Sequence, residues 1–116
     1  MAIYREGVVF YAATATADLT GKAFYFAAID SSGNIVTCGA GGNGVGVIVE
    51  EATAGNAATI QMGGSIVKVK TVGNIVAGSR VQSDTSGLCE SLQSGVALGV
   101  ALTAAVAGDI IPVYMY

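Results

Sequence analysis

The sequence contains few residues of the types that carry out catalysis. It has no histidine, the side chain that most often serves as general base or metal ligand near neutral pH. Cys–His and Ser–His–Asp arrangements therefore cannot form within this chain. Cys38 and Cys89, with the scattered carboxylates, do not give the ligand spacing of a zinc site. We expect no enzymatic activity, no catalytic residues, no metal site and no cofactor.

Three other motifs could suggest ligand chemistry, but each has a simpler explanation. Glu50 and Glu51 are neighbours, and neighbours on a strand point to opposite faces, so they cannot act as an acid–base pair. Segments 30–33 and 84–87 share the pattern Asp-x-Ser-Gly but lack the alternating acidic ligands of a calcium loop. They are typical of tight turns. The glycine-rich segment 39–46 lacks the Lys-Ser/Thr of a phosphate-binding loop and predicts a hairpin loop.

Composition limits the class of protein. The 116 residues are enough for one domain, and 53% of them are hydrophobic. Charged residues make up 11%, against about 25% in an ordinary soluble domain. Such a weakly charged surface suits a protein that is covered by neighbours. A net charge of −3 with five basic residues argues against binding to nucleic acid or to an anionic membrane.

The sequence also bears on the cellular compartment. The longest apolar stretch, 96–107, is shorter than the roughly 20 residues that cross a bilayer as a helix. Arg5 and Glu6 interrupt the start of the chain and no apolar signal core follows, so we expect a cytosolic product. Two reduced, buried thiols are favoured for Cys38 and Cys89, although a single bridge between them stays open.

Apolar residues alternate along most of the chain, and Val, Ile, Thr, Tyr and Gly recur throughout. This pattern favours short strands joined by turns, and hence an all-β sandwich or small barrel with few or no helices. The Ala-rich segments 12–17 and 103–107 are ambiguous and could each form one helical turn. Strands are predicted at 7–11, 23–29, 34–38, 45–50, 57–62, 65–71, 79–83, 97–102 and 110–115.

An internal repeat organises these strands. Segment 46–62 aligns with 99–115 without a gap, and both copies carry Gly-Val, then Ala-x-Ala-Gly followed by Asn or Asp, then a strand ending in Met. The Asp-x-Ser-Gly turns precede the two copies at nearly equal distances. The chain is therefore divided into an N-terminal arm with a first strand, 1–18, and a single β domain, 19–116. Within that domain we predict pseudo-repeated units at about 19–62 and 76–115, joined by the strand 65–71.

Alternation assigns the faces of the repeated strands. Ile60 and Val113 belong to the inward sets of the two copies, and Tyr114 points outward. Pro112 cannot donate to a ladder and predicts an edge strand or a bulge. Lys68 and Lys70 share one face of their strand, where they either protect a sheet edge or meet an acidic partner.

Surface tyrosines and the N-terminal arm are the remaining candidates for a partner-binding site. Tyr and Arg are enriched among interface anchors, and several occur at the two ends of this chain. The predicted partner-binding residues are Ile3, Tyr4, Arg5, Val8, Tyr114 and Tyr116.

Taken together, the turn unit, the Gly-Val…Ala-x-Ala-Gly segment, its repeat, and the final Ala-Gly-Asp-Ile-Ile-Pro-Val-Tyr at 107–114 resemble the small capsid decoration (cement) proteins of tailed bacteriophages. The resemblance covers roughly residues 19–115. It implies a structural virion protein made in the host bacterial cytoplasm and bound, as a homotrimer, to the outer surface of the head. There it would contact the phage major capsid protein and stabilise its lattice, with residues 2–10 as the first candidate for that contact. It implies no nucleic-acid or membrane partner and no catalytic residues.

Two alternatives stay open. One is the capsid-anchored base of a head fibre, for which a shaft or receptor domain is expected beyond Tyr116. The other is a carbohydrate-binding surface module, which would need a groove lined by aromatic residues. The absence of Trp and an aromatic content of 7% disfavour the second alternative.

Overall fold

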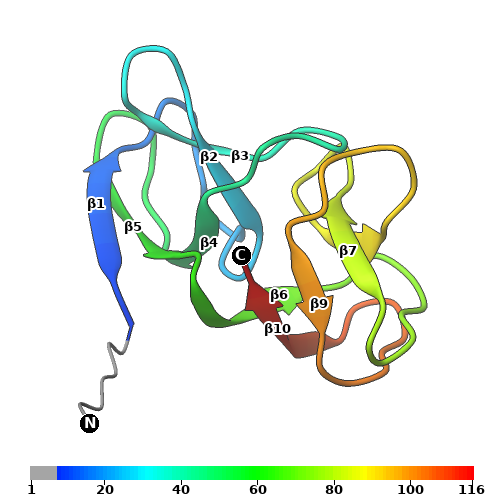
Figure 1. Ribbon diagram of the computed structural model, residues 1–116. Helices are drawn as coiled ribbons and strands as arrows, with labels where there is room; N and C mark the ends of the chain where they lie inside the picture. The colour runs from blue at the N-terminus through cyan, green and yellow to red at the C-terminus, as the bar shows by residue number, and fades with distance from the viewer. Residues whose placement is uncertain (1–7) are drawn as a thin grey trace, which may run out of the picture.

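The computed structural model describes residues 8–116, and within them it contains ten β-strands and no helix (Figure 1). The all-β prediction is confirmed. The strands are β1 (Phe10–Thr14), β2 (Phe26–Ile29), β3 (Ile35–Thr37), β4 (Gly46–Glu50), β5 (Ala57–Met62), β6 (Ser65–Lys70), β7 (Arg80–Ser83), β8 (Cys89–Ser91), β9 (Gly99–Ala101) and β10 (Ile110–Met115).

The strands form two five-stranded antiparallel sheets with the same topology. The order is β1-β5-β4-β2-β3 in the first sheet and β6-β10-β9-β7-β8 in the second. Each strand of the first sheet thus has a counterpart five strands later in the chain. The repeat is therefore a structural one, and we call residues 10–62 unit 1 and residues 65–115 unit 2. Strand β6 opens unit 2 as β1 opens unit 1, so the segment at 65–70 is part of the repeat rather than a joining strand.

Equivalent turns in the two units are held by the same hydrogen bonds. The Oδ1 atom of Asp30 accepts bonds from the backbone N–H groups two and four residues later, both at 2.9 Å. Asp84 does the same at 2.8 and 2.9 Å. Gly33 and Gly87 follow with φ of 83° and 93°, a region that suits glycine. The Asp-x-Ser-Gly segments are turns, as the sequence predicts.

The core has two parts, and the predicted strand faces are confirmed. Unit 1 encloses a small cluster that includes Ile48 and Ile60. Unit 2 encloses a larger one that includes Val69 and Val113, and this cluster extends into unit 1 through Phe26. Burying such side chains supplies most of the driving force for folding.

Four backbone hydrogen bonds and one close glycine contact join the two units. The backbone N–H of Phe26 donates to the Gly87 carbonyl at 2.7 Å, and that of Lys70 donates to the Phe24 carbonyl at 2.8 Å. Gly41 and Gly95 touch so closely that a Cβ on either would collide with the other's Cα. The Gly41 N–H donates to the Ser83 carbonyl at 2.8 Å, and the Val96 N–H to the Gly41 carbonyl at 3.0 Å. We call this set of contacts the unit junction.

The junction depends on an insertion in unit 1. The pairings Phe26–Val47 and Arg80–Val100 make Phe26 and Arg80 equivalent. From the turn residue Gly21 to Phe26 the chain advances five positions, but from Gly78 to Arg80 only two. Unit 1 thus carries three additional residues, 23–25. Their centre is Phe24, whose φ of 70° is rare for a residue with a side chain.

Some local predictions are wrong. Pro112 lies in β10, which is an interior strand and not an edge or a bulge. The sheet tolerates proline there because the neighbouring strand β9 is short and has already ended at this point. The Pro112 carbonyl accepts a hydrogen bond from the N–H of Leu102, one residue beyond β9. Strand β8 was not predicted, and segments 12–17 and 103–107 contain no helical turn. Strand β6 is a sheet edge, as its lysines indicated.

Two further sequence expectations can be set beside the structure. Cys38 and Cys89 are free and buried. No helix of sufficient length and apolarity to cross a bilayer occurs between residues 8 and 116.

Candidate protein-interaction surfaces

The part of the chain that the structure describes offers no metal-binding cluster of three or more Cys, Asp or Glu side chains. Its notable features are exposed apolar side chains. They gather in three places: on β1, at the end of β10, and on two loops of unit 2.

Of the predicted partner-binding residues, Ile3, Tyr4 and Arg5 lie outside the described residues. Val8 is exposed just before β1. Tyr114 and Tyr116 are brought together at the end of β10, with their ring centroids 6.2 Å apart in an edge-on arrangement.

The tyrosine pair extends onto β6. Tyr114 pairs across the sheet with Ile66, whose side chain is also exposed. The structure therefore makes a small aromatic and aliphatic surface from β6 and β10, with Tyr116 at its end.

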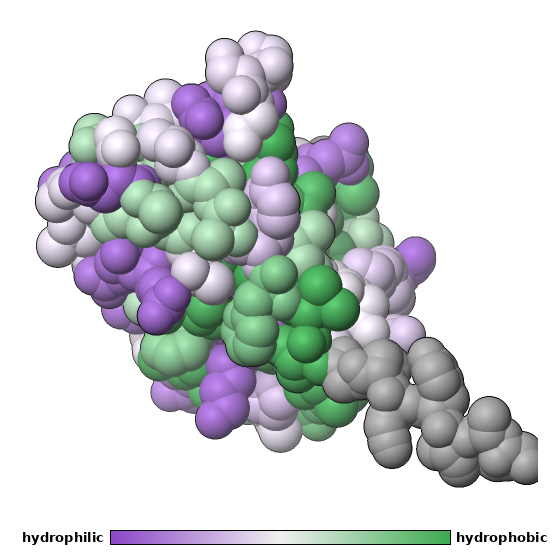
Figure 2. Space-filling view, turned by 90° about the vertical axis from the view of Figure 1, so that its left-hand side faces the viewer, coloured by the Kyte–Doolittle hydropathy of each residue, from purple (hydrophilic) through white to green (hydrophobic). Residues whose placement is uncertain are grey.

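A second apolar surface lies along the edge strand β1. Val8, Val9, Phe10 and Tyr11 are all at least 47% exposed. Figure 2 looks onto this side of the molecule and shows a green apolar band next to the grey N-terminal atoms. Val8 was named from the sequence as a partner-binding residue, and Val9 and Phe10 fall within the segment 2–10 that the resemblance implied, whereas Tyr11 was not expected. Four consecutive apolar residues predict an ordinary buried strand, and the local sequence does not indicate that no second sheet covers them.

The third surface is formed by two loops of unit 2, residues 71–78 and 101–109, which we call the unit 2 loop pair. The loops lie side by side: Ile75 and Ala105 exchange two backbone hydrogen bonds of 2.9 and 3.0 Å, and the Gly78 N–H donates to the Ala101 carbonyl at 2.8 Å. Four large apolar side chains project from them, including Val76, which is 72% exposed. These four residues are Val72, Val76, Leu102 and Val106.

Unit 1 has an equivalent pair of loops, residues 15–21 and 50–56, with a different surface. The Leu19 N–H donates to the Ala52 carbonyl at 2.8 Å, matching the bond between Ile75 and Ala105. Apart from Ala17 and Ala54, the exposed side chains here are polar or acidic. In Figure 1 this unit 1 loop pair lies far from the unit 2 loop pair. The exposed polar residues are Thr16, Asp18, Thr20, Glu50, Glu51, Thr53 and Asn56.

Two positions can be matched residue by residue. The backbone N–H groups of Thr16 and Val72 donate to equivalent carbonyls on β3 and β8. The carbonyls of Thr53 and Val106 accept from the residue three positions later at 3.1 Å in both cases. The same backbone therefore carries threonine in unit 1 and valine in unit 2. Placing 46–62 on 99–115 in the sequence sets Thr53 on Val106, and that contrast was a signal of this surface.

Charge divides the units in the same way. One lysine and four carboxylates give unit 1 a formal charge of −3, whereas three cations and three carboxylates leave unit 2 neutral. A hydrogen bond from the Thr16 hydroxyl, followed by one from the Asn34 N–H, lowers the pKa of Asp30 below its usual value. Bonds from Thr20 lower the pKa of Asp18. Unit 1 thus presents an exposed acidic loop pair, whereas the loop pair of unit 2 is apolar.

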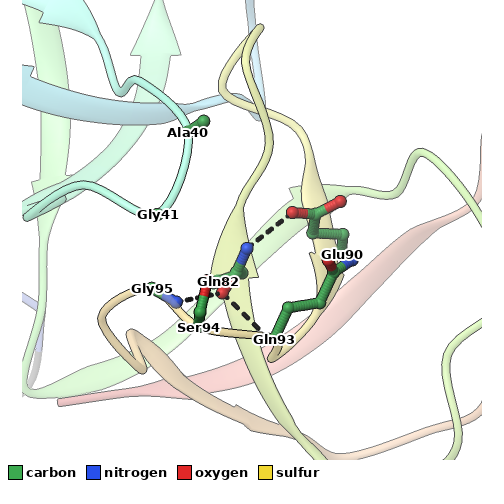
Figure 3. A pocket seen from close by; sticks show the side chains of 7 residues that line it. All are labelled: Ala40, Gly41, Gln82, Glu90, Gln93, Ser94 and Gly95. Carbon is green, nitrogen blue, oxygen red and sulfur yellow. Dashed lines mark hydrogen bonds between the residues drawn. The ribbon is translucent and has the colours of Figure 1, made fainter.

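A small polar cavity of about 410 Å³ lies beside the unit junction (Figure 3). The Gln82 side chain is buried there. Its Oε1 accepts from the backbone N–H groups of Gln93 and Gly95 at 3.0 and 2.9 Å, and its Nε2 donates to Glu90 at 2.7 Å. Because these bonds hold the loop that carries Gly95 against Gly41, we assign Gln82 to the stability of the junction.

Comparison with known proteins gives a structural match. The sequence matches no protein-family model and no curated protein. The fold is similar to the crystal structure of the N base of head fiber protein gp8.5 of bacteriophage phi29, with a TM-score of 0.80 over 95% of each chain. The two sequences are 16% identical over that match. The two proteins therefore share a fold.

Proposed function

We propose that this chain is a structural protein of a tailed-bacteriophage head and serves as the capsid-anchored base of a head fibre. The observation that carries the proposal is the match to the phi29 head-fiber base, which extends over 95% of both chains. The sequence resemblance to capsid decoration proteins points to the same location, the outer surface of the virion. Both roles share attachment to the major capsid protein, and the structural match favours the fibre base.

The unit 2 loop pair is the surface that we assign to capsid attachment. Contiguous exposed apolar side chains on a soluble protein mark interaction sites, because leaving them in water is unfavourable. The equivalent loops of unit 1 show that this backbone does not require apolar residues, since Thr16 and Thr53 occupy the positions of Val72 and Val106. The apolar residues of unit 2 are thus explained by a partner rather than by folding.

Attachment as a homotrimer would strengthen this contact. Three copies present three loop pairs to the shell at once, and multivalent binding can exceed the affinity of each contact by roughly 10² to 10⁴. Val8, Tyr114 and Tyr116 remain candidates for additional contacts, to the capsid or to a shaft, because all three are exposed.

The test is co-sedimentation of the purified chain with expanded heads of its phage, with bound copies counted per shell. The informative variant is Val72→Thr/Val106→Thr, which gives unit 2 the residues that unit 1 already tolerates. The matched control is Thr16→Val/Thr53→Val. We expect saturable wild-type binding, a loss of at least tenfold in affinity for the first variant, and wild-type binding for the control.

Absence of wild-type binding to heads would overturn the proposed function. Equal binding by both double variants would keep the function but remove the unit 2 loop pair as the attachment surface. A tag placed after Tyr116 separates the two head roles: a fibre base must leave this end accessible to an antibody on the assembled head, and a buried tag would contradict that role.

A further inference from the structure

We infer that copies of this chain associate head to tail by repeating, between chains, the part of the unit junction in which the first strand and a turn of one unit meet a strand pair of the other. The partner of the β1 surface is then unit 2 of a second copy. The inference uses the proposed function only for the expected number of copies, three; the surfaces themselves follow from the internal repeat.

Within one chain, unit 1 covers the first strand of unit 2. Val67 on β6 is completely buried, in one cluster with Phe26 and Val47 from unit 1. The turn at Gly87 closes the contact, because the Gly87 carbonyl accepts the Phe26 N–H at 2.7 Å. A first strand and a turn on one unit thus meet a strand pair on the other.

Two elements of this contact, the first strand and the turn, have free counterparts on the opposite side of the chain. The register of β1 on β5 and of β6 on β10 makes Tyr11 equivalent to Val67. Tyr11 is 47% exposed where Val67 is 0% exposed. A Cβ on Gly33 would meet nothing within 4 Å, whereas one on Gly87 would lie 3.1 Å from the Phe26 carbonyl oxygen. Unit 1 therefore carries the docking strand and the docking turn, both uncovered.

The receiving surface is uncovered on unit 2. Arg80 and Val100 occupy the positions of Phe26 and Val47. Phe26 and Val47 are buried, but Arg80 is exposed and Val100 is only partly covered. Each chain therefore has one such contact formed internally. It also exposes a docking strand and turn on unit 1 and a receiving surface on unit 2, which are complementary to each other.

The residues on the open halves suit a contact between chains. Repeating the strand and turn contact brings Arg80 of one copy to Tyr11 and to the 30–33 turn of the next. A guanidinium can stack on a tyrosine ring, and Arg and Tyr are enriched among interface anchors. The turn also carries Asp30, whose pKa is lowered mainly by a hydrogen bond from the Thr16 hydroxyl. The positive charge of Arg80 would therefore meet the negative charge of Asp30. Unit 1 has a formal charge of −3, and in this contact it lies against Arg80, which occupies in unit 2 the position that buried Phe26 has in unit 1.

Such a head-to-tail contact uses different surfaces on the two copies, so it closes into a ring or continues as a filament. The ring expected here contains three chains. The unit 2 loop pair takes no part in the repeated contact and stays available to the capsid.

The experiment measures the mass of the full chain by light scattering over a concentration series. Arg80→Glu and Tyr11→Ser change exposed residues of the two halves, and Lys68→Glu is the charge-matched control on β6, outside the contact. We expect a closed oligomer for the wild type and for Lys68→Glu, and at least a tenfold weaker association for Arg80→Glu and for Tyr11→Ser. Urea unfolding of the monomeric species verifies that each variant is folded.

A cross-link gives a second, positive readout. Ser31→Cys in one copy and Arg80→Cys in another should form an intermolecular disulfide under mild oxidation, while Ser31→Cys with Lys68→Cys should not. A monomeric wild type at all concentrations, or an oligomer that neither Arg80→Glu nor Tyr11→Ser weakens, would overturn the inference. Loss of head binding by an intact oligomer would instead count against the proposed function alone.

Discussion

The unit junction makes a quantitative prediction for two glycines at equivalent turns. Gly33 and Gly87 both have φ near +90°, where an alanine costs roughly 1–2 kcal/mol relative to glycine. The Gly33 position is open, so Gly33→Ala should cost only this amount. At Gly87 an added Cβ would lie 3.1 Å from the Phe26 carbonyl oxygen and 3.3 Å from Thr37 Cβ. Relieving that crowding must move the turn away from β2 and stretch its 2.7 Å hydrogen bond.

Overpacking of this kind typically adds about 1–3 kcal/mol, so Gly87→Ala should cost about 2–5 kcal/mol in total. The assay is urea unfolding of wild type and both variants at a concentration where the chain is monomeric, with the m-value compared between them. Equal losses for the two variants, within about 0.5 kcal/mol of each other, would refute the packing of the 84–87 turn on unit 1. A larger loss for Gly33→Ala would refute it as well.

Three further predictions concern the core, the cysteines and the unit 2 loop pair. Ile60→Ala and Val113→Ala should each lower the free energy of unfolding by about 2–4 kcal/mol, and a loss below about 0.5 kcal/mol in chemical denaturation would contradict the assigned faces. Burial, and then the charges of Glu90 and Asp84, raise the pKa of Cys89 from 9.0 to about 12. The unfolded thiol therefore loses its proton at lower pH than the folded one, and stability should fall by about 1.4 kcal/mol per pH unit between these two values. In Cys89→Ala the stability should fall less steeply with pH in this range. A pH dependence equal to that of the wild type would argue against the raised pKa of Cys89. Thr71 is buried, and its hydroxyl donates to the Val106 carbonyl at 2.8 Å. Thr71→Val should cost about 1–3 kcal/mol and weaken head binding, whereas loss of binding without loss of stability would mean that Thr71 itself touches the partner.

Local chemistry made much of the fold predictable. The carboxylates of Asp30 and Asp84 bond backbone N–H groups within the next four residues, so the turns depend only on neighbours in sequence. The faces of Ile60 and Val113 follow from alternation. The repeat was visible where turn residues are shared.

The remaining features depend on contacts between distant segments. Strand β1 could not be matched to β6, because FYAAT and SIVKVK share no pattern beyond being strands. Strand β8 has three residues and is defined by its pairing with β7. Val67 is buried because unit 1 packs against β6, whereas Tyr11 is exposed because no other unit of the chain packs against β1. The sequence of one strand does not encode this difference.

The three-residue insertion around Phe24 has a consequence for the order of events during assembly. Its carbonyl ties Lys70 to unit 1, and unit 2 has no equivalent segment that could tie β1 of a second copy. Joining the units of one chain is also an intramolecular event, with an effective concentration on the order of millimolar for a short connection. A contact between chains would have neither advantage. Newly made chains would therefore complete their folding alone, and copies would associate only once their concentration is high enough.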